Sequence, residues 1–413
     1  MCARVSAGLR ELADDRAEQV GLTRFFRNPR VTVDEILRSA AERTGAAAAG
    51  RHVLLIEDTS EINYQSKAKR KRGLGRVGNG ADVGLFVHPA LAIDAEDGAV
   101  LGLAGATIWR RTRVKEDDYQ SLPIEEKESH RWIATALKAR TFLSAAALVT
   151  LIADREADIY ELFARVPDEQ THVLVRAVRD RALADVGGRM LSKIAAVPEA
   201  GRLAFDLPGR PGRTARQVTL AVRFCPVTLR QPARGADRRD PSQLSLTLVE
   251  AREIDPPPCE EPIVWRLLTT HAATTLAEAA RIIDLYRRRW IIEEAFKNLK
   301  GDLAIRPIFH QSERRIEAHI FVAFLAYYLQ ITLTRRLHGL APGLTARSAL
   351  AKFAAVQMID VHLPTTDGRE IVLTRTTEPE PDLRLLLDRI NLTLPAQPPP
   401  RIAAAALPAG SSL

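Results

Sequence analysis

The segment Val53–Thr59, VLLIEDT, places four aliphatic residues directly before two acidic ones. A short apolar run of this kind is typical of a buried strand, and the acidic residues would open the loop that follows it. The segment Ala147–Asp154, ALVTLIAD, repeats the pattern. The sequence therefore predicts two buried strands that end just before Asp58 and Asp154, within a mixed α/β sheet.

Further segments complete a sheet flanked by helices. The expected strands are Gly84–Val87, Leu91–Asp94, Leu101–Ala106, Val173–Val175 and Trp265–Thr269, and the expected helices are Ile124–Ala139 and Glu156–Ala164. Residues 1–50 are expected to be helical with a turn at Asn28-Pro29. Alternating apolar residues in the segment 178–264 predict a β-rich insertion, and Arg230–Ser242 would form its long basic hairpin tip.

The second half of the chain is predicted to be mostly helical. Thr274–Lys300 has the pattern of one long helix or of a pair of helices. A short β-hairpin is expected near Asp367-Gly368, and the Pro- and Ala-rich end of the chain is expected to be disordered. Lys67–Arg76 is rich in positive charge and glycine and is expected to be a mobile basic loop, either solvated or tracking phosphates.

Composition favours a polyanionic partner. The 413 residues carry 59 Lys and Arg against 51 Asp and Glu, which gives a net charge of +8 and a pI near 9.6. The three cysteines are scattered without zinc-ligand spacing, and so low a count fits a reducing cytoplasm. Acidic residues interrupt any signal-like run near the N-terminus, and Ile316–Leu333 is too short and polar for a membrane span. We therefore expect a cytoplasmic protein with no membrane partner.

The segment Tyr286–Lys300, YRRRWIIEEAFKNLK, carries a stripe of chemically useful side chains. On a helix, Tyr286, Arg289, Glu293 and Lys300 would lie within roughly 60° of one another. One alternative is a solvated helix in which Arg289 and Glu293 form an ordinary salt bridge. The other is a functional surface that combines a phenol, a guanidinium, a carboxylate and an ammonium group.

Two aspartates at strand ends and one glutamate on a helix suit a magnesium site. Mg²⁺ prefers oxygen ligands and keeps several of its waters, so a few carboxylates suffice to bind it. A pair of such ions activates an attacking oxygen and stabilises a leaving one. Taken singly, Asp58 and Asp154 could instead be helix caps or turn formers.

Five ordered blocks resemble the bacterial insertion-sequence DDE transposases, in the insertion-sequence-four group with the Tyr-Arg-Glu-Lys signature. The signature block is Tyr286-x₂-Arg289-x₃-Glu293-x₆-Lys300. Ile56–Tyr64 is similar to the family's block around the first catalytic acid, and Asp154–Tyr160 is similar to the block around the second. Lys127–Trp132 and Phe25–Val31 are similar to two further family blocks. The resemblance spans nearly the whole chain.

The resemblance implies an RNase H-like catalytic core with an inserted β-rich subdomain and helical N- and C-terminal parts. Asp58, Asp154 and Glu293 would hold two Mg²⁺ ions, for which Mn²⁺ would substitute. Tyr286, Arg289 and Lys300 would grip phosphates. Trp265 and Arg176 would hold a displaced base, although Trp265 could be a core residue and Arg176 could pair with an acid.

The implied activity is cut-and-paste transposition. The enzyme would cleave double-stranded DNA at terminal inverted repeats, pass through a hairpin intermediate and transfer the ends into target DNA, as a homodimer associated with the bacterial nucleoid. The implied segments are a shortened DNA-binding region at 1–50, the core at 51–177 and 265–310, the insertion at 178–264, a helical region at 311–395 and a disordered tail at 396–413.

Two alternatives remain at this stage. Only 57 residues precede Asp58, which is short for the family's end-reading domain. The protein could therefore be a truncated, non-catalytic DNA-binding relative that inhibits a full-length enzyme. Another RNase H-like nuclease, such as a junction resolvase, is disfavoured by the signature and by the insertion.

Overall fold

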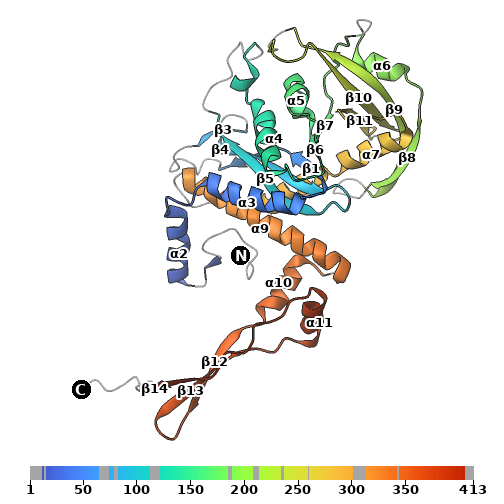
Figure 1. Ribbon diagram of the computed structural model, residues 1–413. Coiled ribbons are helices and arrows are strands. Elements are labelled where there is room, and N and C mark those ends of the chain that lie inside the picture. The colour runs from blue at the N-terminus through green and yellow to red at the C-terminus, as the bar shows by residue number, and fades with distance from the viewer. Residues whose placement is uncertain are drawn as a thin grey trace. The chain divides into compact units, whose positions relative to one another are not determined.

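The computed structural model describes residues 12–13, 15–64, 74–78, 82–111, 121–184, 188–207, 214–233, 237–258, 260–300, 313–341 and 344–404. The chain forms two compact units, residues 7–328 and residues 329–413. The first unit combines one large mixed sheet with flanking helices, which confirms the predicted α/β class (Figure 1). None of the helices described here is long and apolar enough to span a bilayer.

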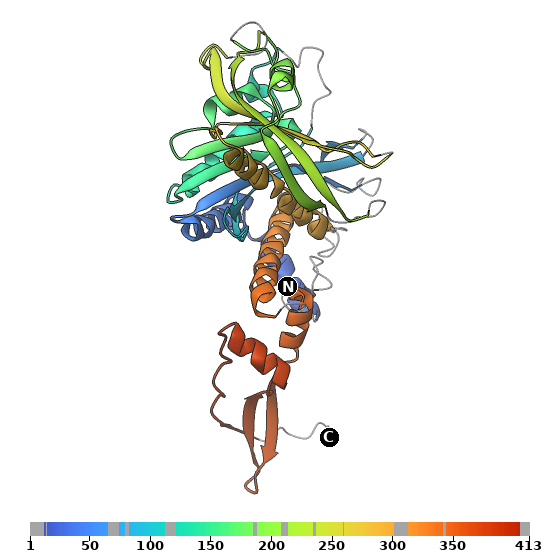
Figure 2. The same ribbon diagram turned by 90° about the vertical axis from the view of Figure 1, so that its right-hand side faces the viewer.

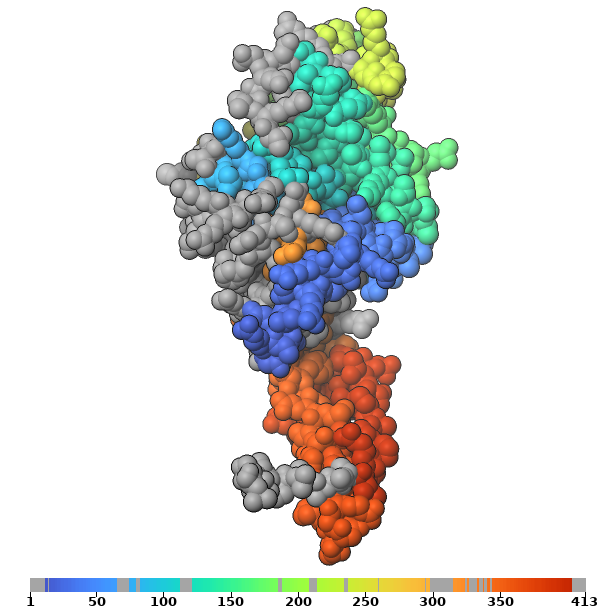
Figure 3. Space-filling view, turned by 90° about the vertical axis from the view of Figure 1, so that its left-hand side faces the viewer, coloured from blue at the N-terminus to red at the C-terminus, as the bar shows by residue number. Residues whose placement is uncertain are grey.

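Two capped helices precede the sheet. They are α2 (Arg16–Arg27) and α3 (Val33–Ala48), separated at Asn28-Pro29 as the sequence predicts. The side chains of Asp15 and Thr32 accept hydrogen bonds from backbone amides in the first turn of each helix, at 2.8 and 3.1 Å. Figure 3 shows both helices on the molecular surface. The buried face of α3 packs on the sheet through an apolar cluster that includes Leu37, Leu103 and Phe321.

The centre of the sheet consists of five strands in the order β5-β4-β1-β6-β7. Their bounds are β1 (His52–Glu57), β4 (Asp82–Asp94), β5 (Val100–Trp109), β6 (Leu148–Ala153) and β7 (Thr171–Arg176). β1 is parallel to β6, and β6 is parallel to β7, whereas β4 runs antiparallel to β1 and to β5. Two short strands, β2 (Ser60–Asn63) and β3 (Gly75–Val77), also pair with β4.

The structure describes only the end of the segment Lys67–Arg76, which the sequence predicts to be a mobile loop. Residues 67–73 lie outside the described residues, but Gly75 and Arg76 belong to β3 and not to a loop. Their backbone pairs with Gly84 and Val83 of β4. The predicted end of the loop at Arg76 is therefore wrong. Glycine has a weak strand propensity, but backbone pairing with β4 outweighs it.

The register between β1 and β6 places two aspartates side by side. Ile56 of β1 is opposite Ile152 of β6, and Asp58 and Asp154 each follow two residues later. Parallel neighbours end at the same edge of a sheet. The fold therefore brings two residues that are distant in sequence to the same sheet edge, where the apolar strands give way to polar turns.

The helices beside β6 are shorter than the sequence predicts. The expected helix Ile124–Ala139 is a 3₁₀ turn, η2 (Ile124–Glu126), followed by α4 (His130–Phe142). The expected helix Glu156–Ala164 is likewise split into η3 (Arg155–Ala157) and α5 (Tyr160–Arg165). The second split occurs because the Asp158 side chain accepts hydrogen bonds from the amides of Val178 and Arg179, and the chain then becomes extended at Ile159.

The β-rich insertion continues the core sheet. Its elements are α6 (Met190–Ala196), β8 (Gly201–Leu207), β9 (Arg216–Arg230) and β10 (Gln243–Glu253), and the chain returns along β11 (Val264–Thr269). β11 pairs with β7 on one side and with β10 on the other, so one sheet extends from β2 to β8 (Figures 1 and 2). Among the described residues the insertion therefore forms no separate sheet.

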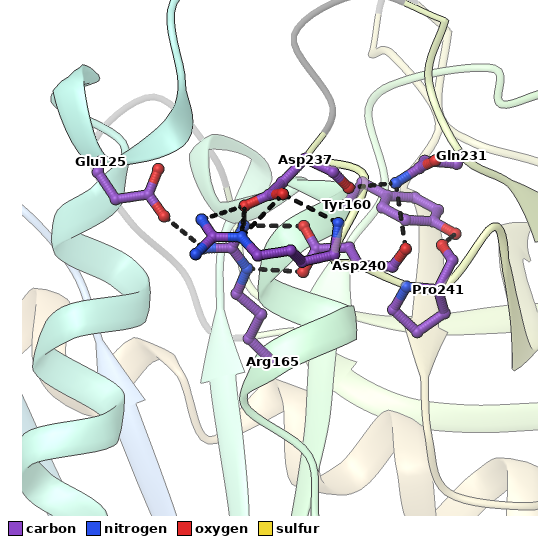
Figure 4. Close-up of polar contacts among 8 residues, drawn as sticks. Glu125, Tyr160, Arg165, Gln231, Asp237, Asp240 and Pro241 are labelled. Carbon is purple, nitrogen blue, oxygen red and sulfur yellow. Dashed lines mark hydrogen bonds and ion pairs between the residues drawn. The ribbon is translucent and has the colours of Figure 1, made fainter.

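The turn between β9 and β10 is fastened to the core by Arg165 of α5 (Figure 4). The guanidinium group donates two hydrogen bonds of 2.8 Å to Asp240 and a third of 2.7 Å to Glu125. The Tyr160 hydroxyl donates to the carbonyl of Pro241 at 2.8 Å. Its charged partners hold the pKa of Arg165 well above its usual value despite the opposing effect of burial. The turn that the sequence predicts as a basic hairpin tip is thus docked through its acidic residues.

Replacing Arg165 by alanine is expected to release this turn. Trypsin cleavage after Arg238 and Arg239 should become at least several-fold faster, because Asp240, nearly buried, would lose its cationic partner. Limited proteolysis of the native protein measures this effect. Arg202→Ala, which removes an exposed pair with Glu199, serves as the control and should leave the cleavage rate unchanged.

Three histidines gather at the opposite edge of the core sheet. The Thr150 hydroxyl group lies 2.9 Å from His52 Nε2 and 2.8 Å from His271 Nε2. The rings of His172 and His271 are stacked with centroids 4.0 Å apart. Burial, reinforced by the neighbouring imidazoles, lowers the pKa of His271 to about 3. This arrangement requires a neutral His271.

We expect the histidine cluster to make the fold sensitive to acid. The folded-state pKa of His271 lies below its unfolded value, so the unfolded chain binds more protons between about pH 3 and pH 6.5. Stability should fall by about 1–2 kcal/mol between pH 7 and pH 5. Denaturant unfolding at pH 7 and at pH 5 measures this loss of stability. His271→Asn should reduce the difference in unfolding free energy between the two pH values. An equal difference in the variant would contradict this assignment.

The second unit contains a small sheet and helices. Its helices are the end of α9 (Glu313–Leu340), α10 (Ala346–Ala354) and α11 (Pro381–Arg389). The predicted hairpin at Asp367-Gly368 is confirmed between β12 (Met358–Pro364) and β13 (Arg369–Thr376). Within the expected disordered tail, in contrast, residues Arg401–Ala404 form β14, because the edge of β13 offers them backbone partners, and residues 405–413 lie outside the described part of the chain.

Candidate active site

Asp58 and Asp154 each use one carboxylate oxygen to hold their own turn. Asp58 Oδ1 accepts a hydrogen bond of 2.7 Å from the amide of Thr59. Asp154 Oδ1 accepts one of 2.8 Å from the amide of Glu156 and so caps η3. The turn-forming role is therefore real for both residues.

A break between two helices brings a guanidinium group to Asp58. The segment predicted as one helix or two forms α7 (Leu276–Arg287) and α8 (Trp290–Lys300). Arg289 lies in the turn between them and donates a hydrogen bond of 3.1 Å to Asp58 Oδ2. It also donates to Glu293 in the first turn of α8. The salt bridge between Arg289 and Glu293 therefore exists, and its guanidinium group joins the helix to the sheet edge.

The charges of the other two acidic residues act on Asp58. Burial raises the pKa of Asp58 to about 6, and the charges of Asp154 and Glu293 push it in the same direction. Arg289 and the amide of Thr59 oppose this rise only in part. The carboxylate side chain of Asp58 is 18% exposed, whereas that of Glu293 is 56% exposed. Burial is thus the main cause of the raised pKa of Asp58, and the two neighbouring carboxylates add to it.

Tyr286 and Arg176 lie next to this cluster. Tyr286 is buried at the end of α7, and burial raises its pKa although Arg289 and Arg176 oppose the shift. Burial also lowers the pKa of Arg176, which ends β7. Arg176 donates a hydrogen bond of 2.9 Å to the carbonyl of Val264 on the neighbouring strand. The structure therefore brings both predicted residues to the edge of the candidate site.

A pocket of about 580 Å³ opens beside the acidic cluster. Trp265 lines it, stacking on Phe205 at a centroid distance of 5.9 Å and meeting Tyr286 edge-on at 6.3 Å. The guanidinium group of Arg287 lies 4.3 Å above the Phe205 ring. The remaining lining residues include Arg176, Arg289, Trp290 and Glu293. Trp265 is therefore part of a pocket wall that is rich in aromatic rings and arginines.

Phe205 and Trp290 are site residues that sequence analysis misses. Phe205 lies on β8 of the insertion and carries no motif that would mark it. Trp290 follows Arg289, and its side chain is 55% exposed. An exposed tryptophan within a run of arginines is a signal that sequence reasoning could have used. Lys300 ends α8, but its side chain lies outside the described residues.

No three side chains of the usual metal-binding types, among the residues that the structure places, are close enough together to bind a metal ion as they stand. The Arg289 guanidinium group contacts both Asp58 and Glu293. The donors nevertheless have suitable chemistry, since Asp58, Asp154 and Glu293 supply the carboxylate oxygens that Mg²⁺ prefers. A divalent cation would also favour the charged form of Asp58, whose pKa is raised mainly by burial.

Comparison with known families assigns the chain. A family model described as the transposase DDE domain matches residues 110–329, more than half of the chain. The match includes Asp154, Arg289 and Glu293, while Asp58 precedes it. Such proteins act on DNA, which agrees with the basic composition and with the arginine-rich pocket. The chain therefore belongs to the family of proteins that carry a transposase DDE domain.

Proposed function

We propose that the protein is a cut-and-paste DNA transposase of the insertion-sequence-four group, with Asp58, Asp154 and Glu293 as its catalytic carboxylates. The observation that carries the proposal is geometric: Asp58 and Asp154 follow neighbouring parallel strands at the same point, and Arg289 contacts both Asp58 and Glu293. These residues come from β1, β6 and α8 and are otherwise far apart in the chain.

An RNase H-like core is part of the same proposal. Its support is the central strand order β5-β4-β1-β6-β7, with antiparallel pairing on one side of β1 and parallel pairing on the other. This topology places the ends of β1 and β6 beside each other, where a pair of carboxylates can share cations. The insertion follows β7 and returns along β11.

The three carboxylates would hold two Mg²⁺ ions, with Mn²⁺ as a substitute. When bound, the ions would activate the attacking oxygen and stabilise the leaving oxygen during phosphoryl transfer. The Arg289 guanidinium group contacts both Asp58 and Glu293. In the proposed enzyme the same group would also be suited to a DNA phosphate, which a guanidinium group can contact with two donors at once.

The aromatic pocket would hold a base displaced from the duplex next to the cleaved bond. Extruding a base costs a few kcal/mol, and stacking on an aromatic ring offsets about 1–3 kcal/mol of it. Trp265 and Phe205 provide the rings, while Arg176 and Arg287 add positive charge at the same pocket. Tyr286 and Lys300 are proposed as phosphate contacts near the transposon end.

We further propose cleavage through a hairpin intermediate, strand transfer into target DNA, and a homodimer that brings two ends together at the bacterial nucleoid. A plasmid that carries this reading frame's flanking DNA, with any paired inverted repeats it contains, tests the catalytic part. Incubation with Mg²⁺ should give nicked products, and denaturing gels should reveal hairpin ends that are absent with EDTA.

The same assay separates this proposal from its alternative. DNA binding without metal-dependent cleavage would contradict catalysis and support a non-catalytic, inhibitory relative. Nicking without hairpins or strand transfer would overturn the cut-and-paste mechanism but leave a metal-dependent nuclease. A plasmid of equal length without the inverted repeats provides the matched control.

A further inference from the structure

Arg131 of α4 connects the turns that carry the two aspartates. Its Nε donates a hydrogen bond of 3.1 Å to the Thr59 hydroxyl, in the turn after Asp58. Its Nη2 donates one of 2.6 Å to Glu156, in the turn after Asp154. The amides of Thr59 and Glu156 are the donors that hold Asp58 Oδ1 and Asp154 Oδ1. One planar group therefore contacts both residues that orient the carboxylates.

The position of this guanidinium group is itself fixed. Its third nitrogen, Nη1, donates to the carbonyl of Glu128 at 2.9 Å, and the group lies 4.7 Å above the ring of Trp109. The ring of Trp132 is 5.5 Å away on its own helix. The Arg131 side chain is only 10% exposed. A planar group held by three hydrogen bonds and an aromatic face has little freedom to rotate.

The partner on the Asp58 side is fixed as well. Arginine only donates, so the Thr59 hydroxyl accepts from Arg131, and the same hydroxyl also lies within hydrogen-bond distance of His88 Nδ1, 2.9 Å away. His88 Nε2 in turn contacts Glu57 Oε2 at 3.2 Å within the core. A chain of hydrogen bonds therefore connects α4, the turn after Asp58 and β4. A displacement of Arg131 would be transmitted to the turn that holds Asp58.

We propose that Arg131 is a positioning residue that sets the separation of Asp58 and Asp154 by bridging Thr59 and Glu156. This inference rests on the proposed function, because it assigns Arg131 a role toward the cations that the two aspartates would share. Arg131 touches neither carboxylate in the described contacts, and it acts through the two turns. Residues that orient metal ligands in this way typically contribute 10–100-fold to metal affinity.

Mn²⁺ binding to the full chain without DNA tests the role, with free Mn²⁺ measured by electron paramagnetic resonance. Arg131→Gln should weaken Mn²⁺ binding about 10-fold or more. Arg131→Lys keeps the charge but not the planar fork, so it should not restore binding. Arg140→Gln is the matched control on the same helix, since Arg140 pairs with Asp168 away from the aspartate turns, and its Mn²⁺ binding should equal that of the wild type.

A second variant covers the possibility that Arg131→Gln impairs folding. Glu156 is 63% exposed, so Glu156→Gln should leave the thermal midpoint nearly unchanged while weakening Mn²⁺ binding. The double variant Arg131→Gln, Glu156→Gln should be no weaker than the poorer single variant, because both remove one bridge. A purely structural Arg131 would instead lower the thermal midpoint and leave the Mn²⁺ affinity of the folded protein intact.

The outcomes separate this role from the proposed function. If the wild type binds Mn²⁺ and cleaves DNA while Glu156→Gln and Arg131→Gln bind Mn²⁺ equally well, the positioning role is overturned and the proposed function stands. A wild type that neither binds Mn²⁺ nor cleaves DNA overturns both. Weaker binding in Arg131→Gln and Glu156→Gln, with Arg140→Gln unaffected, supports both.

Discussion

Asp154→Asn is expected to reduce the rate of metal-dependent DNA cleavage on the order of 10³-fold or more. Loss of a principal charge-stabilising group in phosphoryl transfer typically has an effect of this size. Asparagine keeps the acceptor oxygen that caps η3, so the turn should survive. What it removes is the negative charge that the proposed cations require. Glu293→Gln should cause a comparable loss of cleavage, because it removes another of the proposed carboxylate ligands. Glu293 is largely exposed, so the replacement should disturb no packing.

Cleavage rates and DNA affinity should be measured on the same protein preparations. DNA binding measured without metal should stay within a few-fold of wild type, since the substitutions remove no positive charge. Asp168→Asn is the matched control, because Asp168 lies in the turn between α5 and β7 and pairs with Arg140. Cleavage near the wild-type rate in Asp154→Asn would remove Asp154 from the catalytic set. A parallel loss of DNA binding would point to misfolding instead.

The second large effect concerns stability at a neighbouring acid. Asp158 is almost fully buried, and its Oδ2 accepts hydrogen bonds of 2.8 and 2.9 Å from the amides of Val178 and Arg179. Its Oδ1 accepts a third, of 2.9 Å, from the buried Arg181. Asp158→Ala would leave that guanidinium group buried without its carboxylate. Breaking such a pair by removing one partner costs about 3–5 kcal/mol.

Denaturant unfolding of the metal-free protein measures this loss. Asp154→Asn serves as the comparison, because Asp154 is partly exposed and pairs with no buried cation in the described contacts. Its unfolding free energy should stay within about 1 kcal/mol of the wild-type value. A loss below about 1 kcal/mol for Asp158→Ala would mean that water reaches Arg181 and replaces the carboxylate. The two aspartates of one short motif should thus separate into a catalytic and a structural residue.

The sequence predicts the sheet edge well because its signals are local. Apolar runs before Asp58 and Asp154 mark the strands, and the observed strands end at the residues before them. That β1 and β6 are parallel neighbours depends on the pairing of distant segments, which no local pattern reports. The family resemblance provided the expectation that these aspartates meet, and the register of β1 against β6 provides the geometry.

Contacts between distant segments explain what the sequence did not predict. The position of Phe205 beside Trp265 depends on the path of the insertion, and the docking of Asp240 depends on Arg165. The helical periodicity of Tyr286–Lys300 correctly groups Tyr286, Arg289 and Glu293, although a break separates α7 from α8. The sequence does not decide between one helix and two in this segment, because the apolar periodicity of one helix and of two successive helices is nearly the same.

The continuity of the sheet from β2 to β8 bears on how such proteins diversify. Deleting the insertion would expose the backbone edge of β11 and remove the strand against which it is paired, so the segment is not a module that can be exchanged freely. Length changes are tolerated most easily where backbone groups have no ladder partner. Variation among relatives should therefore accumulate at the hairpin turns that join β8 to β9 and β9 to β10, while strand lengths stay nearly constant.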